Sequence, residues 1–452
     1  MIPERTEKLV QQLDSFDESE RGEAVRRLAL ALPGQAEREP KAEVNLHCHT
    51  FFSYNAFGWS PSRFAWEAAG YPLEAAGIVD FDVLDGVEEF LRAGRRFGLK
   101  SAAGFESRVF IPEYRDRVIN SPHEPGIYYL AGTGFVGPPE PGTPAAATLQ
   151  AMGECAQRRN RQKTARINEH LAPVTIDYDE DVLPLTPAGN ATERHMLVAY
   201  ERRAREVLEG EAALAQFWSE KLEEPLRYVE ELLDDVVGLK KLIRSRLMKH
   251  GGVGYAPPEE GSFPSLDEVV RMTRECGAIP SGCWLDGTRA GEEDPLRHFS
   301  FLRDKGIPTL TVIPDRNWNV DDPKERALKV QKLHEALDAA AELEMPVLVG
   351  TEMNKAGQKF VDTFSAPALE PYRQRFLDAA HLVWGHTLLK STSGVGYTGA
   401  WADEHFGEDR AARNGFFARV GARPHPDRES REALSELGNR AGPEEFLSAL
   451  GP

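Results

Sequence analysis

The chain has 452 residues, of which 72 are acidic and 54 basic, giving a formal net charge of −18 at pH 7. Its hydrophobic content of 41% is ordinary for a soluble globular protein, and its length suggests two or three structural units. Because the basic residues are not clustered, nucleic acid is not favoured as a partner. No apolar stretch is long enough to span a membrane, and the N-terminus is a charged amphipathic helix without a signal-peptide core. The four cysteines have no C-x-x-C spacing, which fits a reducing cytoplasm better than a disulfide framework.

Strand and helix patterns alternate over the first third of the chain. Short apolar or β-branched runs indicate strands, and the segments between the first three of them have helical character. This alternation predicts a parallel sheet or barrel. The expected strands are 44–46, 75–80, 101–106 and 126–130, and the expected helices are 61–69 and 85–97.

A long helical block interrupts the alternation, which then resumes. Apolar residues recur at three- and four-residue spacing from 192 to 247, so residues 145–250 are predicted to be a helical insertion. We expect an N-terminal helical segment (1–40), a first barrel part (41–144), this insertion, a second barrel part (251–400) and a polar C-terminal tail (401–452). In the second barrel part the expected helices are 266–276, 295–303 and 323–343, and the expected strands are 278–283, 308–313 and 346–350.

The residues with the clearest chemistry stand at the predicted strand ends. His47 and His49 are two apart, so on a strand they face the same side and could hold one metal ion. In a parallel barrel the strand ends share one rim, which carries the active site. Each acid also has a plainer interpretation, as a helix cap or a solvated strand end. The acids that follow the later strands are Asp80, Asp82, Glu106 and Glu352.

Five short motifs include or lie near these residues: HCHT (47–50), GIVDFDVLDG (77–86), GFE (104–106), TERHML (192–197) and GTEMN (350–354). In order, they are similar to H-x-H-[ST], to a segment containing T-D-H-D, to G-x-E and to an R-x-H segment of some insertions, and the last is in the place of G-S-D-x-H, all in the PHP (polymerase and histidinol phosphatase) superfamily of metal-dependent phosphoesterases. The resemblance extends over about residues 43–134 and less tightly over 263–386. It implies a distorted (β/α)7 PHP-type barrel, TIM-barrel-like, with a helical insertion, and up to three metal ions that activate water against a phosphate ester.

The chain departs from this family at several ligand positions. Phe81, Tyr129 and Asn354 stand where the family has histidines, and its A-H-P reads here as Gly282-Cys283-Trp284. The resemblance therefore implies one divalent ion rather than three, zinc or manganese with iron as a further option. The ligands that remain for this ion are His47, His49, Glu106 and Glu352.

The leading hypothesis is a metal-dependent hydrolase of phosphate esters with a reduced metal centre, acting on a small phosphorylated molecule. Asp80 or Asp82 would orient the water as a base, while Arg316, and Arg194 with His195, would bind the phosphate.

Each of these assignments has a competing interpretation. Arg316 could instead form a surface salt bridge with Asp315 or Asp322, and His195 could be an ordinary helix-surface histidine. Cys283, beside Trp284, could be a nucleophile, but a buried structural thiol is the commoner role. An inactive barrel that binds a ligand, and a metal-dependent enzyme of another class, such as an amide hydrolase or a lyase acting on sugars, remain open. The sequence does not indicate an oligomeric state.

Overall fold

The computed structural model describes residues 2–31, 40–258 and 261–451. These residues form two compact units. The first, which we call the barrel unit, comprises the described residues of Met1–Thr50, Asn55–Gln150 and Pro264–Pro452, and the second, the helical unit, comprises those of Phe51–Tyr54 and Ala151–Phe263. The predicted segments 1–40 and 251–400 include residues 1, 32–39 and 259–260, which lie outside the described residues.

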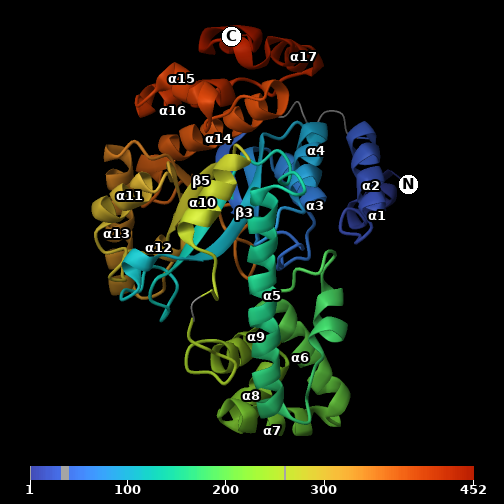
Figure 1. The fold of residues 1–452 in the computed structure, drawn as a ribbon. Helices are drawn as coiled ribbons and strands as arrows, with labels where there is room; N and C mark the ends of the chain where they lie inside the picture. Colours follow the sequence, from blue (N-terminus) through green and yellow to red (C-terminus); the bar gives the residue numbers. More distant parts are fainter. Residues whose placement is uncertain (1, 32–39, 259–260, 452) are drawn as a thin grey trace. The chain divides into compact units, whose positions relative to one another are not determined.

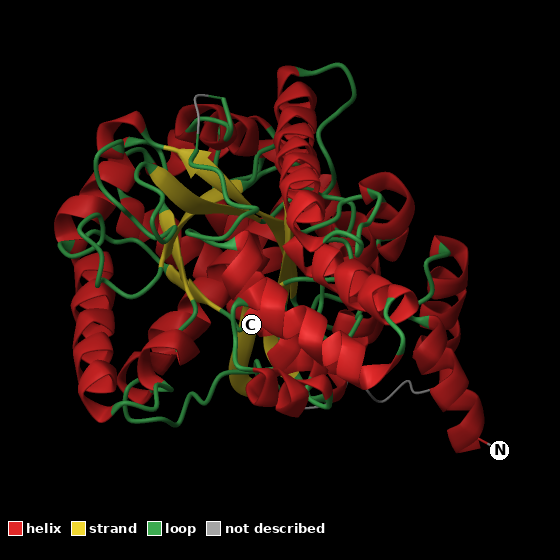
Figure 2. Ribbon diagram, turned by 90° about the horizontal axis from the view of Figure 1, so that it is seen from below, coloured by secondary structure: helices red, strands yellow, loops and turns green. Residues whose placement is uncertain are grey.

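One seven-stranded sheet forms the centre of the barrel unit, with its strands hydrogen-bonded in the order in which they occur in the chain (Figure 1). The sheet is nearly closed into a barrel, and helices lie on the outside of the yellow strands in Figure 2. The predicted α/β barrel is therefore confirmed. Its strands are β1 (Lys41–Cys48), β2 (Leu73–Phe81), β3 (Ser101–Phe110), β4 (Ile127–Thr133), β5 (Ile279–Trp284), β6 (Thr309–Val312) and β7 (Val347–Val349).

The prediction of an entirely parallel sheet is wrong at β4, which runs antiparallel to both β3 and β5. A parallel connection needs a crossover of a dozen or more residues, usually through a helix. Between β3 and β4 the structure has turns and one short 3₁₀ segment, Pro112–Tyr114. The chain therefore returns along β3, and the start of β4 lies at the rim where β3 ends.

The barrel is closed by backbone hydrogen bonds between β1 and the segment after β7. We call this segment, Gly350–Met353, the closing segment. The amide of Glu352 donates to the carbonyl of His47 (2.7 Å), and the amide of His49 donates to the carbonyl of Glu352 (2.8 Å). The side-chain amide of Asn45 adds a hydrogen bond to the Thr351 hydroxyl (2.8 Å). The final strand pairing thus runs through both predicted histidine ligands.

Helices cover the outside of the sheet, and their boundaries carry the expected local signals. The α3 helix begins after Ser60, whose hydroxyl accepts the Arg63 amide, and Ser265 and Glu268 form a capping box on α10. The helices flanking the strands are α1 (Ile2–Gln12), α2 (Glu18–Ala31), α3 (Pro61–Gly70), α4 (Val87–Phe97), α10 (Leu266–Glu275), α11 (Pro295–Asp304), α12 (Asp315–Trp318) and α13 (Pro323–Glu342).

The region predicted as a polar tail is a packed helical layer. Phe416, Phe417 and Phe446 are fully buried there, and Trp401 packs against all three rings. The aromatic residues of this region are far apart in the sequence and come together only when its short helices pack against α14. A composition rich in polar residues does not reveal this packing. The elements of this region are α15 (Ala400–Phe406), α16 (Arg410–Ala422), α17 (Arg428–Leu437), η7 (Gly438–Arg440) and α18 (Pro443–Ala449), and the elements before it are η6 (Glu370–Tyr372) and α14 (Arg373–Ser393).

The helical unit has its own hydrophobic core, in which Trp218 and Tyr200 are completely buried. The Glu193 carboxylate links different segments of this unit, because it forms ion pairs with Lys163, Arg244 and Lys249. The elements are α5 (Pro144–Leu171), within which the boundary between the units falls, η3 (Tyr178–Val182), η4 (Leu183–Leu185), α6 (Glu193–Val207), α7 (Gly210–Leu222), α8 (Leu226–Leu233), α9 (Val236–Ile243) and η5 (Arg244–Met248).

Among the described residues, no helix combines the length and the apolar character that crossing a lipid bilayer would require.

Closure of the barrel requires a glycine at position 350. A Cβ atom there would lie 2.4 Å from both the Cβ and the backbone nitrogen of His47, closer than such atoms approach in proteins. We expect Gly350→Ala to lower the free energy of unfolding by about 1–3 kcal/mol, a typical cost of overpacking, because His47 must move. Chemical denaturation would measure this effect.

Gly153 offers the matched control, because it lies inside α5 and a Cβ there meets nothing within 4 Å. Gly153→Ala should leave stability unchanged or raise it slightly, since alanine favours helix. Equal behaviour of the two variants would contradict the close approach of Gly350 to β1.

Candidate metal site

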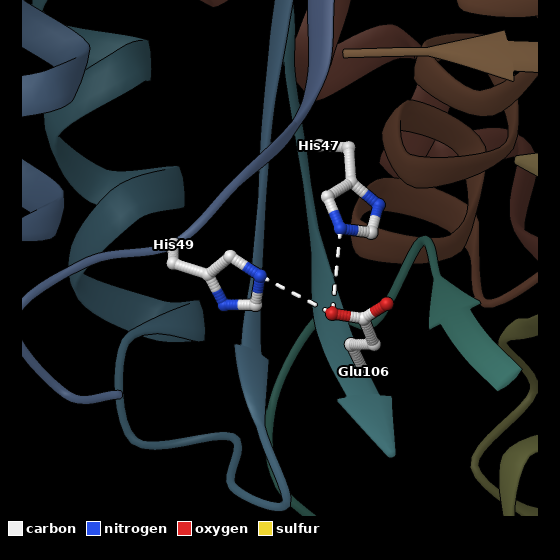
Figure 3. A group of neighbouring side chains, drawn as sticks. All are labelled: His47, His49 and Glu106. Atoms are coloured by element: carbon white, nitrogen blue, oxygen red, sulfur yellow. Dashed lines mark ion pairs between the residues drawn. The ribbon is translucent and has the colours of Figure 1, made fainter. Parts of the chain in front are cut away.

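His47 near the end of β1, His49 directly after this strand and Glu106 of β3 point toward one another inside the barrel (Figure 3). Side chains two apart on a strand share a face, so His47 and His49 both turn inward while Cys48 between them turns away. Glu106 comes from β3, two strands further along the sheet. The convergence of both histidines with Glu106, expected from the sequence pattern, is present in the structure.

The three side chains are close enough to hold one metal ion. Oε2 of Glu106 lies 3.5 Å from Nε2 of His47 and 3.2 Å from Nε2 of His49. One ligand atom from each residue can be chosen so that all three lie within 4.8 Å of one another. All three residues are buried, with His47 1% and Glu106 5% exposed.

Several polar atoms of this group are buried without a hydrogen bond. In the described part of the chain, neither ring nitrogen of His47 makes a hydrogen bond, and neither does Oε2 of Glu106. Buried polar atoms are nearly always paired in native proteins, so such a gap calls for an explanation. Two imidazoles and a carboxylate are the ligand types that a catalytic zinc site uses, and the residues present therefore fit a divalent metal ion.

The electrostatics of the group favour an anionic glutamate between two imidazoles. Burial alone would raise the pKa of Glu106, but His47 and His49 hold it well below its usual range. Burial would lower the pKa of His49, but the charge of the neighbouring Glu106 carboxylate raises it. A divalent cation at this point would add positive charge beside the anionic carboxylate.

Phe81 stands where the resembling family has a histidine, and it packs against a candidate ligand. Its ring stacks on the His49 imidazole with a centroid separation of 4.4 Å and an interplanar angle of 23°. The aromatic face therefore restricts the orientation of the His49 ring, which a metal ligand needs.

Glu352 lies near this group but belongs to a different pairing. Its Oε1 forms an ion pair with the Arg316 guanidinium, and its Oε2 accepts a hydrogen bond from the Gln358 side chain (2.9 Å). Burial would raise the pKa of Glu352, but Arg316 lowers it. Since Glu352 is outside the group of three, its predicted role as a fourth ligand stays a prediction.

The closing segment holds Glu352 in an unusual backbone conformation. Glu352 and Met353 have φ angles of +64° and +54°, a region that residues other than glycine rarely adopt. Such conformations cost of order 1–3 kcal/mol each, and they cluster at functional sites. Here they allow the backbone of Glu352 to bond to both histidines while its side chain meets Arg316.

Arg316 is the cation at this site, and it is accessible. Its side chain is 42% exposed, whereas that of Glu352 is 9% exposed. The predicted alternative, a surface salt bridge with Asp315 or Asp322, is not what the described residues show: the acid bonded to Arg316 is Glu352.

The two aspartates at the end of β2, Asp80 within the strand and Asp82 directly after it, accept hydrogen bonds from neighbouring hydroxyl groups. Asp80 accepts hydrogen bonds from the Thr50 amide (2.7 Å) and the Thr50 hydroxyl (2.6 Å). Asp82, at a φ of +58°, accepts one from the Ser107 hydroxyl (2.5 Å). Neither caps the following helix by its side chain, because the N-cap of α4 is Gly86 without a side-chain hydrogen bond.

Arg194 and His195 belong to the helical unit, at the start of α6. His195 occupies the third helical position of a capping box, where its Nδ1 accepts the Thr192 amide (3.0 Å). Its ring is buried, packs edge-on against Tyr54, and burial lowers its pKa to about 4. The alternative of a helix-surface histidine is therefore wrong, and the substrate-binding role predicted for both residues stays a prediction.

Two residues at the site were not predicted as functional. The Cys283 thiol on β5 lies 3.9 Å from Oε1 of Glu106, and burial together with Glu106 raises its pKa well above the usual range. Alternation along β5 could have indicated that Cys283 faces inward. Nothing in the sequence pattern pointed to Gln358. The ring of His386 forms hydrogen bonds with the carbonyl of Gly134 and the amide of Tyr397.

The fold and site together define a class: a nearly closed, seven-stranded α/β barrel with a buried His-His-Glu group that could hold a metal ion. Two solved structures are similar in fold. One is an amidohydrolase from Chromobacterium violaceum, with bound sulfate and no metal, at a TM-score of 0.47 and 16% identity, covering 74% of this chain and 96% of that one.

The other is a proposed metal-dependent phosphoesterase from Bifidobacterium adolescentis, at a TM-score of 0.43 and 16% identity, covering 75% of this chain and 98% of that one. At this identity the likenesses concern the fold and not the chemistry. No protein-family model matches the sequence, and neither does any curated protein.

The His195 cap predicts acid sensitivity of the helical unit. In the folded protein the pKa of His195 is about 4, below its ordinary value of 6.5. The contribution of the neutral His195 cap to the free energy of unfolding is therefore complete above pH 6.5 and is lost as the pH falls toward 4. Glutamine is a usual residue at this capping position and does not titrate. Between about pH 7 and about pH 5, we expect the wild type to lose about 2 kcal/mol more unfolding free energy than His195→Gln.

Urea denaturation followed by circular dichroism at both pH values would measure this difference. His250→Gln serves as the control, because His250 is exposed in the same unit. A His195→Gln variant with the same pH dependence as the wild type would contradict the assignment of a neutral, buried cap.

Proposed function

We propose that the barrel unit is a metal-dependent hydrolase of phosphate esters that works with one divalent ion held by His47, His49 and Glu106. The observation that supports this most is the buried cluster of ligand atoms at metal-binding separation, in which His47 and Oε2 of Glu106 lack hydrogen bonds within the described chain. Zinc or manganese, with iron as a further option, suits two imidazoles and a carboxylate.

An ion in this position supplies Lewis acidity and lowers the pKa of a bound water toward neutrality. The residues of the chain would position the reacting groups. Asp80, through its two bonds to Thr50, fixes the loop that directly follows His49. Asp82 stands at the end of β2 and is the candidate to orient the attacking water as a base.

Arg316 is the candidate to bind the phosphate. One part of its guanidinium is engaged by Glu352, and the exposed remainder of the side chain offers donors that match a phosphate in a planar, bidentate geometry. The substrate class proposed is therefore a small phosphorylated molecule. Neither nucleic acid nor a membrane is part of the proposal, and Arg194 with His195 remains a proposed second contact to the phosphate.

Metal binding is the first test. We expect the protein purified without chelator to contain about one equivalent of zinc, manganese or iron by elemental analysis, and His47→Ala/His49→Ala to contain none, because loss of two ligands leaves a single carboxylate. His123→Asn is the matched control, since His123 is exposed on the β3–β4 connection and asparagine tolerates its positive φ.

A screen of phosphomonoesters and phosphodiesters with the metal-loaded protein would complete this test. A correctly folded protein that takes up no divalent ion would refute the proposal. A protein that binds the ion and phosphate but hydrolyses nothing would favour a ligand-binding barrel. The contacts of Glu352 with Arg316 and Gln358 support this alternative, because they occupy both carboxylate oxygens.

Removing the Arg316 cation should weaken phosphate recognition without removing the ion. We expect Arg316→Met to raise the dissociation constant for inorganic phosphate by about tenfold or more, since hydrogen bonds to charged groups contribute about 1.5–3 kcal/mol. Arg316→Lys keeps the charge and should lose less. Calorimetric titration at constant ionic strength would compare the variants, and an unchanged phosphate affinity in Arg316→Met would exclude this residue as the anion contact.

A further inference from the structure

Cys283 faces the same interior space as the three candidate ligands. It lies on β5 and is 8% exposed, with its sulfur 3.9 Å from Oε1 of Glu106. The two oxygens of Glu106 thus have different surroundings, since Oε2 faces the histidines and Oε1 faces the thiol. A sulfur atom therefore stands on the side of Glu106 away from the imidazoles.

A zinc ion held by three protein ligands has a fourth position to fill, and the nearby acid is already engaged. Glu352 has one oxygen on Arg316 and the other on Gln358, so its use as a ligand would break an ion pair and a hydrogen bond. For Cys283 the structure records one long hydrogen bond of the thiol, to Glu106. A change of its side-chain rotamer would therefore break only this weak hydrogen bond.

On this basis we propose that Cys283 is the fourth ligand of the resting ion, as a thiolate, giving a His47–His49–Glu106–Cys283 centre selective for zinc over manganese. In the metal-free arrangement the sulfur lies outside the group of three, so binding requires the Cys283 side chain to turn toward the histidines. The thiol proton is released to solvent when the thiolate binds the ion, and no oxidation is involved. Thiolate is a soft ligand that suits zinc, whereas manganese prefers oxygen.

This inference rests on the proposed function, because it needs the ion at the barrel site, and it adds a form of regulation. Four side-chain ligands close a tetrahedral site, whereas catalysis needs a position for water. Hydrolysis would then require the centre to gain a fifth ligand or Cys283 to leave. The resting protein would then be an inactive, metal-loaded form of the enzyme.

Cobalt(II) is the probe that tests this, because it replaces zinc and reports a bound thiolate by a sulfur-to-metal charge-transfer band in the near ultraviolet. We expect the band in the full-length cobalt-loaded protein and its loss in Cys283→Ser, with at least about a tenfold loss of the zinc-over-manganese preference in competition titrations. Cys48→Ala must keep the band, because Cys48 lies between the two histidines on the opposite face of β1.

The outcomes separate the two proposals. Cobalt bound without a charge-transfer band in the wild type would overturn the role of Cys283 and leave the metal site standing. No cobalt bound at all would overturn the proposed function and this inference with it. A band that survives in Cys283→Ser and disappears in Cys48→Ala would show that Cys48 supplies the sulfur ligand. This result would overturn the role proposed for Cys283. The absence of the band from the wild-type spectrum would overturn the role of Cys283 whether or not Cys283→Ser folds correctly.

Discussion

Closure of the barrel by the backbone of Glu352 is the constraint on which the site depends. The hydrogen bonds from Glu352 to the carbonyl of His47 and from His49 to Glu352 fix the last strand pairing at the two imidazole-bearing residues. The two positive φ angles of Glu352 and Met353 are the cost of this closure. Neither the histidine pair nor the Arg316 ion pair would keep its place if the closing segment separated from β1.

Charge is shared between two buried carboxylates that have different partners. Glu106 faces two imidazoles, which together form a site that a divalent cation can complete. Glu352 is already neutralised by the arginine at the rim. Glu352 is therefore balanced by a permanent cation, whereas Glu106 faces two titratable imidazoles, which are also possible metal ligands.

The sequence predicted the parts of the fold that depend on local patterns. The strands around His47, Asp80 and Glu106 follow from apolar runs, and the inward turn of both histidines follows from the two-residue period of a strand. The antiparallel β4 depends on the absence of a crossover helix after β3, and the packed C-terminal layer depends on α14 as a support. The contacts of Glu352 with Arg316 and Gln358 depend on the conformation of the closing segment. The spacing of residues in the sequence does not predict this conformation.

Phe81 shows how one aromatic ring can shape a candidate metal site. A ring face offers no donor atom to a metal ion on this side of His49. The same ring, stacked on His49, restricts the imidazole to an orientation that points at Glu106. Phe81 therefore favours the convergence of His47, His49 and Glu106 without adding a ligand of its own. The accessible guanidinium of Arg316 places a permanent positive charge close enough to interact with Glu106, and this charge is available to an anionic ligand.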